Sequence, residues 1–81
     1  MNTYHFELHG KCPVDDTHDV YEVELKSKFF IQCEDIVDFI KDHSLLIIYQ
    51  EPLSRKIKDK FTNCEVKVTG YHSGIKVVCT L

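Results

Sequence analysis

The chain has 81 residues, of which 43% are hydrophobic and 28% are charged, and its formal net charge is −3. This length allows one domain over residues 1–81, close to the lower limit for a self-sufficient hydrophobic core. The composition is that of a globular protein and excludes a disordered chain. The negative charge provides no general attraction to phosphate backbones, so we expect no direct nucleic-acid binding.

The N-terminal segment Met1–His5 has neither a basic start nor an apolar run, so we expect no signal peptide. The longest apolar run, Leu45–Tyr49, is too short to cross a bilayer, and we expect no membrane partner. The four cysteines are Cys12, Cys33, Cys64 and Cys79. They lack Cys-x-x-Cys spacing, which disfavours a structural zinc site. Reduced thiols in the cytoplasm are therefore expected.

Apolar and polar residues alternate over Thr3–His9 and again over Tyr21–Leu25, which predicts two half-buried strands. Gly10 opens the turn between them, and the two strands should form an antiparallel hairpin. From about Gln32 the period changes to that of a short amphipathic helix, which ends at His43-Ser44. Its apolar stripe is expected to be Ile36, Val37 and Ile40, with Phe39 at the edge.

The run Leu45–Tyr49 has no polar face, so it is either a buried connector or a surface that meets another chain. Gln50-Glu51-Pro52 has the features of a helix start, and Asn63 ends this second helix. Its buried stripe should be Leu53, Ile57 and Phe61. A third strand over Glu65–Thr69, a turn over Gly70–Gly74 and a last strand over Ile75–Leu81 complete the chain.

The predicted order is ββααββ, and the predicted fold class is α+β. Two hairpins would form a four-stranded antiparallel sheet with two helices on one face. So small a sheet leaves its other face and both edges open. Open edges pair readily with other strands, so we expect self-association into a homo-oligomer.

The segment from Cys12 to Asp19 joins the first two strands and carries reactive side chains. The proline after Cys12 biases the cysteine backbone toward extended geometry, which holds the thiol at a defined angle. Turn-forming residues follow and can bring Asp19 near Cys12. A thiol beside a carboxylate suits nucleophilic catalysis with proton transfer. The alternative is a hairpin turn with an incidental buried cysteine.

Three motifs and the order ββααββ carry a family resemblance. The first motif is Cys-Pro followed by five residues and Asp, which is the spacing of a nucleophile segment in that family and is present here from Cys12 to Asp19. The second is a His-Glu pair that opens the second helix of the family, and Gln50-Glu51 stands at this place. The stretch Glu24–Phe30 matches a cofactor motif with one residue missing after Ser27. The chain thereby resembles the NADPH-dependent 7-cyano-7-deazaguanine (preQ0) nitrile reductases of queuosine biosynthesis. These have the tunnelling fold, whose subunits join edge to edge into barrels with sites at their interfaces.

The resemblance implies a role for each of these residues. Cys12 would attack the nitrile carbon to form a covalent thioimide, and Asp19 would supply or guide the proton. Glu51 would accept hydrogen bonds from the base of preQ0 and Gln50 would contact its polar edge, although Glu51 is also explained by the helix dipole alone. Four residues would contact NADPH, or would simply form a charged strand end: Glu24, Lys26, Ser27 and Lys28.

Other activities of the same fold stay open at this point. A related branch adds ammonia to the same nitrile on transfer RNA, which gives an amidine instead of reducing it to preQ1. Pterin-forming members bind zinc through a His-x-His pair, and none of the five histidines is arranged so, which disfavours a metal site. The last alternative is a non-catalytic tunnelling-fold protein that binds a purine or pterin.

Overall fold

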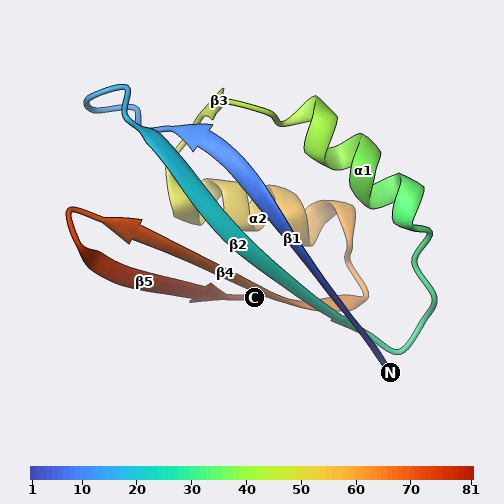
Figure 1. Ribbon diagram of the computed structural model, residues 1–81. Coiled ribbons are helices and arrows are strands. Elements are labelled where there is room, and N and C mark those ends of the chain that lie inside the picture. Colours follow the sequence, from blue (N-terminus) through green and yellow to red (C-terminus); the bar gives the residue numbers. More distant parts are fainter.

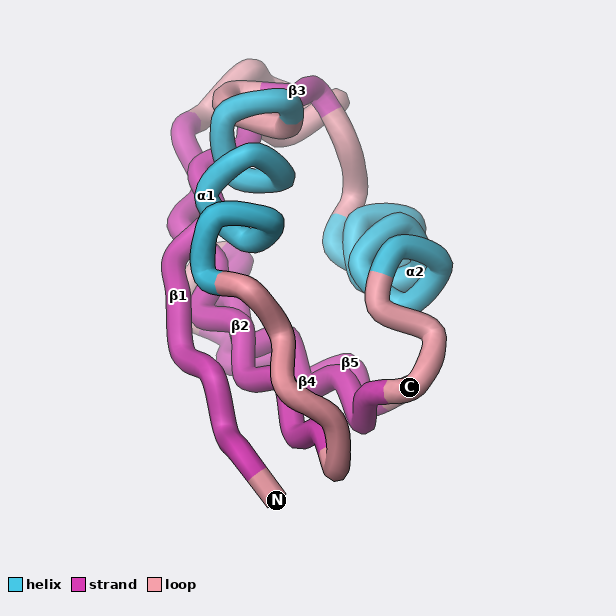
Figure 2. The backbone as a smooth tube through the Cα atoms, turned by 90° about the vertical axis from the view of Figure 1, so that its right-hand side faces the viewer, coloured by secondary structure: helices cyan, strands magenta, loops and turns pink.

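A computed structural model describes residues 1–81 and shows two helices packed on one face of a five-stranded sheet (Figures 1 and 2). The strands lie in the order β3-β1-β2-β4-β5. The elements are β1 (Asn2–Lys11), β2 (His18–Ser27), α1 (Cys33–Asp42), β3 (Leu46–Ile47), α2 (Gln50–Lys60), β4 (Cys64–His72) and β5 (Ile75–Thr80). The α+β class and the two helices are therefore confirmed. No helix of the structure is both long and apolar enough to span a membrane.

The first hairpin forms as the alternation of residues predicted. β1 and β2 pair antiparallel, from Asn2 opposite Ser27 to Lys11 opposite His18, so both strands extend beyond their predicted ends. Because side chains alternate between the faces of a strand, every second residue points toward the helices. Leu8 on β1 and Tyr21 on β2 are the most deeply buried pair at the turn end of this hairpin.

The second hairpin differs from its prediction. Gly70, expected to open the turn, lies within β4, which continues to His72 and pairs with β5. The turn is shorter and consists of Ser73 and Gly74, both with positive φ, at 52° and 82°. Ile75, the first residue of β5, is 66% exposed. Val77, Cys79 and Leu81, which lie on the same face of the chain as Ile75, are half-buried.

The sheet is mixed, which corrects the expected four-stranded antiparallel arrangement. Leu46–Ile47 forms a fifth strand, β3, that runs parallel to the end of β1. The amide of Leu45 donates to the carbonyl of His9 over 2.7 Å, and that of Ile48 donates to Lys11 over 3.1 Å. Parallel pairing follows because α1 returns the chain along the sheet before β3 begins (Figure 1). The connector thus covers the Gly10–Lys11 end of this edge of the sheet.

The two helices bury one stripe each against the sheet. In α1 the buried residues are Ile36 and Phe39, while Val37 is 45% exposed, so the expected stripe is turned by one position. Phe39 packs edge-on against Phe61, with ring centroids 5.7 Å apart, and this contact joins the two helical segments. α2 starts at Gln50 and buries the predicted Leu53 and Ile57.

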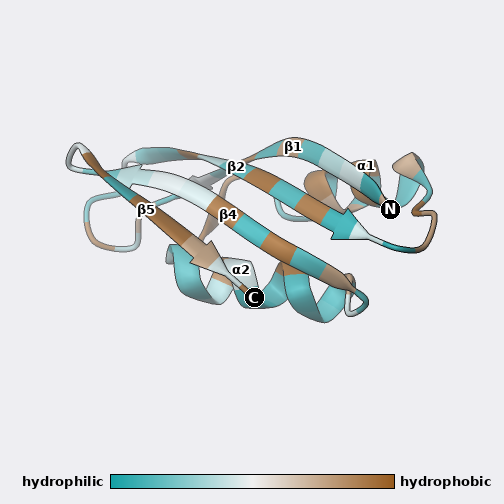
Figure 3. Ribbon diagram, turned by 90° about the horizontal axis from the view of Figure 1, so that it is seen from below, coloured by the Kyte–Doolittle hydropathy of each residue, from teal (hydrophilic) through white to brown (hydrophobic).

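Twelve buried residues form one core between the helices and the sheet. Figure 3 shows hydropathy alternating along β2 and β4, whereas β5 is hydrophobic along most of its length. β5 is an edge strand with apolar side chains on both faces, including Val78 at 43% exposure. The core residues are Leu8, Tyr21, Val23, Leu25, Ile36, Phe39, Leu53, Ile57, Phe61, Cys64, Val66 and Val68.

Candidate active site

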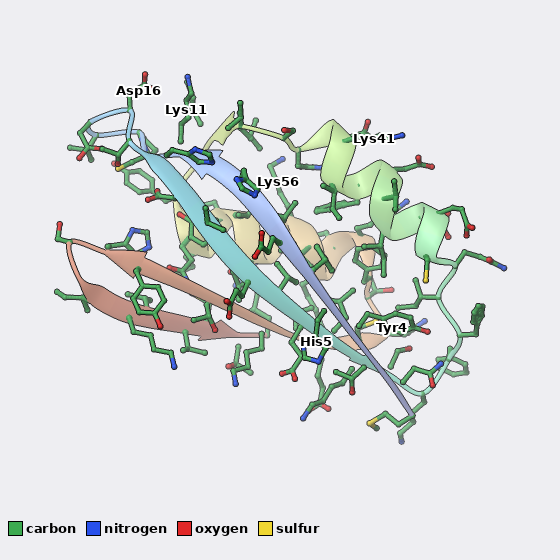
Figure 4. All side chains as sticks on the ribbon, in the orientation of Figure 1. Tyr4, His5, Lys11, Asp16, Lys41 and Lys56 are labelled. Atoms are coloured by element: carbon green, nitrogen blue, oxygen red, sulfur yellow. The ribbon has the colours of Figure 1, made fainter.

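The turn between β1 and β2 holds Cys12 in a closed loop of backbone hydrogen bonds. The amide of Cys12 donates to the carbonyl of Thr17 over 2.9 Å, and the amide of Asp16 donates to the carbonyl of Cys12 over 2.9 Å. Asp16 adopts φ 61°, a left-handed conformation that aspartate tolerates better than most residues. The ion pair between Lys11 and Asp16, at 3.9 Å, closes the outer side of the turn (Figure 4).

Within this turn the carboxylate beside Cys12 is that of Asp15. Its Oδ1 accepts from the hydroxyl of Thr17 at 2.8 Å and from the amide of Thr17 at 3.1 Å. These two bonds, followed by one from the thiol of Cys12, lower the pKa of Asp15. Asp15 is thus ionised at neutral pH and acts as a hydrogen-bond acceptor. The local sequence pointed to Asp19 as the partner of the thiol and overlooked this nearer residue.

Asp19 lies at the start of β2 and is bonded to Tyr21 two residues further on. The hydroxyl of Tyr21 donates to Oδ2 of Asp19 over 3.3 Å. Burial, followed by the negative charge of Asp19 and this hydrogen bond, holds the pKa of Tyr21 well above its usual value.

Gln50, the first residue of α2, is buried and links the helix to the second hairpin. Its Nε2 donates to the carbonyl of Val68 at 3.0 Å and to the carbonyl of Val77 at 2.9 Å. Its Oε1 lies 2.7 Å from Nε2 of His72. All three contacts are internal, so the amide hydrogens expected to meet a substrate are used within the protein.

His72 ends β4 and belongs to the same group of side chains. Its ring lies 6.0 Å from that of Tyr21, centroid to centroid, at an angle of 47°. Gly70 lies on the same face of β4 as His72 and leaves space for the side chains of Tyr21 and Gln50. A Cβ at this position would lie 2.6 Å from the Tyr21 ring and 3.0 Å from Oε1 of Gln50. The glycine is therefore required by close packing rather than by a turn.

Glu51 follows Gln50 and is exposed in the first turn of α2. It forms neither an ion pair nor a side-chain hydrogen bond within the chain, so its carboxylate is free to accept from a ligand. The partial positive charge of the helix N-terminus favours this carboxylate. The start of α2 lies at the same end of the sheet as the β1–β2 turn (Figure 1).

The structure therefore brings four predicted residues to one end of the sheet, namely Cys12, Asp19, Gln50 and Glu51. The predicted cofactor residues lie at the other end, because β2 runs about 30 Å from one end to the other. Lys26 and Lys28 are exposed there and line a hollow of about 490 Å³ with Lys58. The remaining two have other partners: Ser27 is buried and accepts from the amide of Phe29, and Glu24 pairs with His5 at 3.9 Å.

Neither Cys12 nor Glu51 lies in a main hollow of the single chain. The groove between α1 and α2 is lined mainly by charged residues such as Asp38, Asp59 and Lys56, with no nucleophile among them. A ligand held between Cys12 and Glu51 would thus stay partly exposed in a single chain.

No protein-family model and no curated protein sequence matches the chain. Among solved structures, it superposes on that of the archaeosine synthase QueF-Like in the apo form with a TM-score of 0.86. The two chains share one fold. The match covers 99% of this chain and 89% of that one, with 18% of residues identical. At this identity the match shows the fold alone.

Three members of the site were not predicted: Asp15, Tyr21 and His72. Tyr21 was taken for a core residue, although its spacing of two from Asp19 places both on one face of β2. His72 was placed in a turn because Gly70-Tyr71 resembles a turn signal. Continuing the alternation of β4 through Gly70 would have placed His72 on the inner face, beside α2.

Proposed function

We propose that the chain acts on the nitrile of preQ0, with Cys12 as the nucleophile. The observation that carries this proposal is that the β1–β2 turn with Cys12, the start of β2 with Asp19 and the start of α2 with Glu51 lie at one end of a sheet that has the fold of an archaeosine synthase. A nucleophile, a proton-handling carboxylate and a free carboxylate that can accept from a base are together there. Glu51 accepts from the N–H edge of the deazaguanine, and the nitrile points toward Cys12.

The first step is the addition of the thiol to the nitrile. The Sγ–C bond forms while one π bond of the nitrile breaks, and the nitrile nitrogen takes the proton that the thiol gives up. The product is a thioimide, and no other reactant is consumed. Asp19, at the start of β2 and hydrogen-bonded to Tyr21, guides this proton.

The second step distinguishes reduction from amidine formation. Reduction of the thioimide to the amine of preQ1 is a four-electron change, so two NADPH molecules, bound in turn, would supply two hydrides, and the thiol of Cys12 would be released when its bond to carbon breaks. Lys26 and Lys28 suit the phosphates of NADPH, whereas the buried Ser27 does not. These lysines are too far from Cys12 of the same chain, so reduction requires a second copy that brings its own lysine end to this site. We accordingly propose a homo-oligomer with sites at its interfaces, in a reducing compartment such as the cytoplasm. Addition of ammonia, which needs no such partner site, is the alternative.

Intact mass spectrometry of the protein mixed with preQ0 tests the first step. We expect wild type to gain the mass of one preQ0, Cys12→Ala to gain nothing, and Cys33→Ala to behave as wild type. Cys33 is the matched control because its thiol is exposed at the start of α1, away from the site. NADPH or ammonia is then added separately to the adduct to identify the second step. An adduct on Cys12→Ala, or none on wild type, would contradict the proposal, and in the second case a non-catalytic purine binder would remain.

A further inference from the structure

The orientation of the Gln50 side chain follows from its partners. Both groups that contact Nε2 are backbone carbonyls, of Val68 and Val77, and a carbonyl only accepts hydrogen bonds. The nitrogen of the amide must therefore face them, and the oxygen must face His72. Gln50 is only 5% exposed, so water does not compete for these contacts.

This orientation also determines where His72 carries its proton. Oε1 of Gln50 is an acceptor at 2.7 Å, so Nε2 of His72 must be the donor. In the neutral ring the lone pair then lies on Nδ1, which forms no hydrogen bond within the chain. His72 thus presents an unused proton acceptor, and Gln50 can stabilise the ring in its neutral and its protonated forms.

The surroundings of this imidazole suit proton transfer. The ring of Tyr21 on β2 lies 6.0 Å from that of His72, Tyr21 in turn donates to Asp19, and Gln50 contacts His72 from α2. Tyr21 keeps its proton because its pKa is raised, and Asp15 in the turn stays ionised. With Nε2 directed at Gln50, the His72 ring can accept a proton at Nδ1 and release it again without breaking that contact.

We propose that His72 is the proton-transfer residue of the site and that Gln50 is the positioning residue that sets its tautomer. The inference rests on the proposed function. Nδ1, rather than the carboxylate of Asp19, takes the proton of the Cys12 thiol and returns it to the nitrile nitrogen as the Sγ–C bond forms, so the imidazole is neutral again after the step. A nucleophile, a base and a group that orients the base are the usual parts of such a site.

The kinetic test follows the rate of adduct formation between pH 5 and pH 8 by intact mass spectrometry. His72→Asn keeps an N–H for Gln50 but has no titrating ring, so we expect the rate to fall about 10²-fold or more and to lose its histidine-like pH dependence. His5→Asn is the control and should match wild type, since His5 is exposed on the opposite face of the sheet. A His72→Asn protein with the wild-type rate and pH profile overturns the inference and leaves the proposed function intact. Wild type without an adduct overturns both.

The structural test needs no activity. Nitrogen-15 shifts of the wild-type rings should show His72 protonated at Nε2 and His43 protonated at Nδ1, because Nδ1 of His43 contacts the carbonyl of Phe39 at 2.9 Å. The two histidines thus serve as references for one another in one spectrum. In Gln50→Met, which removes the amide and keeps the length, the His72 tautomer should become mixed and adduct formation should slow. Protonation of wild-type His72 at Nδ1, or a mixed tautomer there, would overturn the role of Gln50.

Discussion

Gly70→Ala is a sharp test of the packing that forms the site. The added Cβ would lie 2.6 Å from two carbons of the Tyr21 ring, about 1 Å closer than carbon atoms usually approach. Tyr21 is 1% exposed and belongs to the core, so its ring can move away only by displacing core neighbours. Overpacking of this kind costs about 1–3 kcal/mol, and weakened Gln50 hydrogen bonds add about 1 kcal/mol. The lower entropy of the unfolded alanine chain offsets about 0.5–1 kcal/mol. The expected loss is therefore about 1–3 kcal/mol.

Urea unfolding measures this loss as a change in midpoint at constant slope. The variant should remain folded, because a domain of this size is usually stable by about 4–12 kcal/mol. The matched comparison introduces Gly70→Ala into a Tyr21→Leu background, where the ring is absent and the added methyl should cost less than about 1 kcal/mol. A single variant within about 0.5 kcal/mol of wild type would refute the reasoning, as would an equal loss in both backgrounds.

Three further variants test the turn, the edge and the base-binding carboxylate. The pKa of Asp15 is lowered by Thr17, so the stability that Asp15 contributes is present above about pH 4 and is lost as the pH falls through the pKa of the folded state. The melting temperature of Asp15→Asn should therefore depend less on pH in this acidic range than that of wild type. On β5, Leu81 forms a hydrogen-bonded pair with Val66, so the amide of Val78 points away from β4. Val78→Pro should therefore leave the hydrogen bonds between β4 and β5 intact but shift the protein from oligomer to monomer in sedimentation. A wild-type protein that is monomeric at micromolar concentration would contradict edge pairing. Glu51→Gln should weaken preQ0 binding in calorimetry by roughly 1.5–3 kcal/mol, and unchanged affinity would place the base elsewhere.

The alternation and periodicity of the sequence were enough to predict most of the fold. The first hairpin and α2 follow from local patterns, because one face of each is buried and polar residues occupy the other. β3 could not be found in this way. Its two residues pair with the end of β1 through contacts that depend on the path of α1, and a run as short as Leu46–Ile47 carries no period. The buried stripe of α1 was turned by one position because Phe61, distant in sequence, packs on Phe39.

The candidate site was predictable only in part. The spacing of Cys12 and Asp19 and the helix start at Glu51 were local signals, and the structure places all three at one end of the sheet. The roles assigned to them stay predictions. His72 required knowledge that β4 continues past Gly70, and a glycine in a sequence does not show whether it serves a turn or close packing. The separation of Lys26 from Cys12 likewise became visible only when β2 was seen to run the length of the sheet.

The contact of Gly70 with Tyr21 and Gln50 also constrains the order in which this sequence can evolve. A side chain at position 70 is tolerated only after the ring at position 21 has become smaller, and any such change also disturbs the amide at position 50. Single substitutions are thus disfavoured along most routes, and replacements at these positions should appear together in divergent homologues. Exposed positions such as Lys56 have no such restriction and should vary independently.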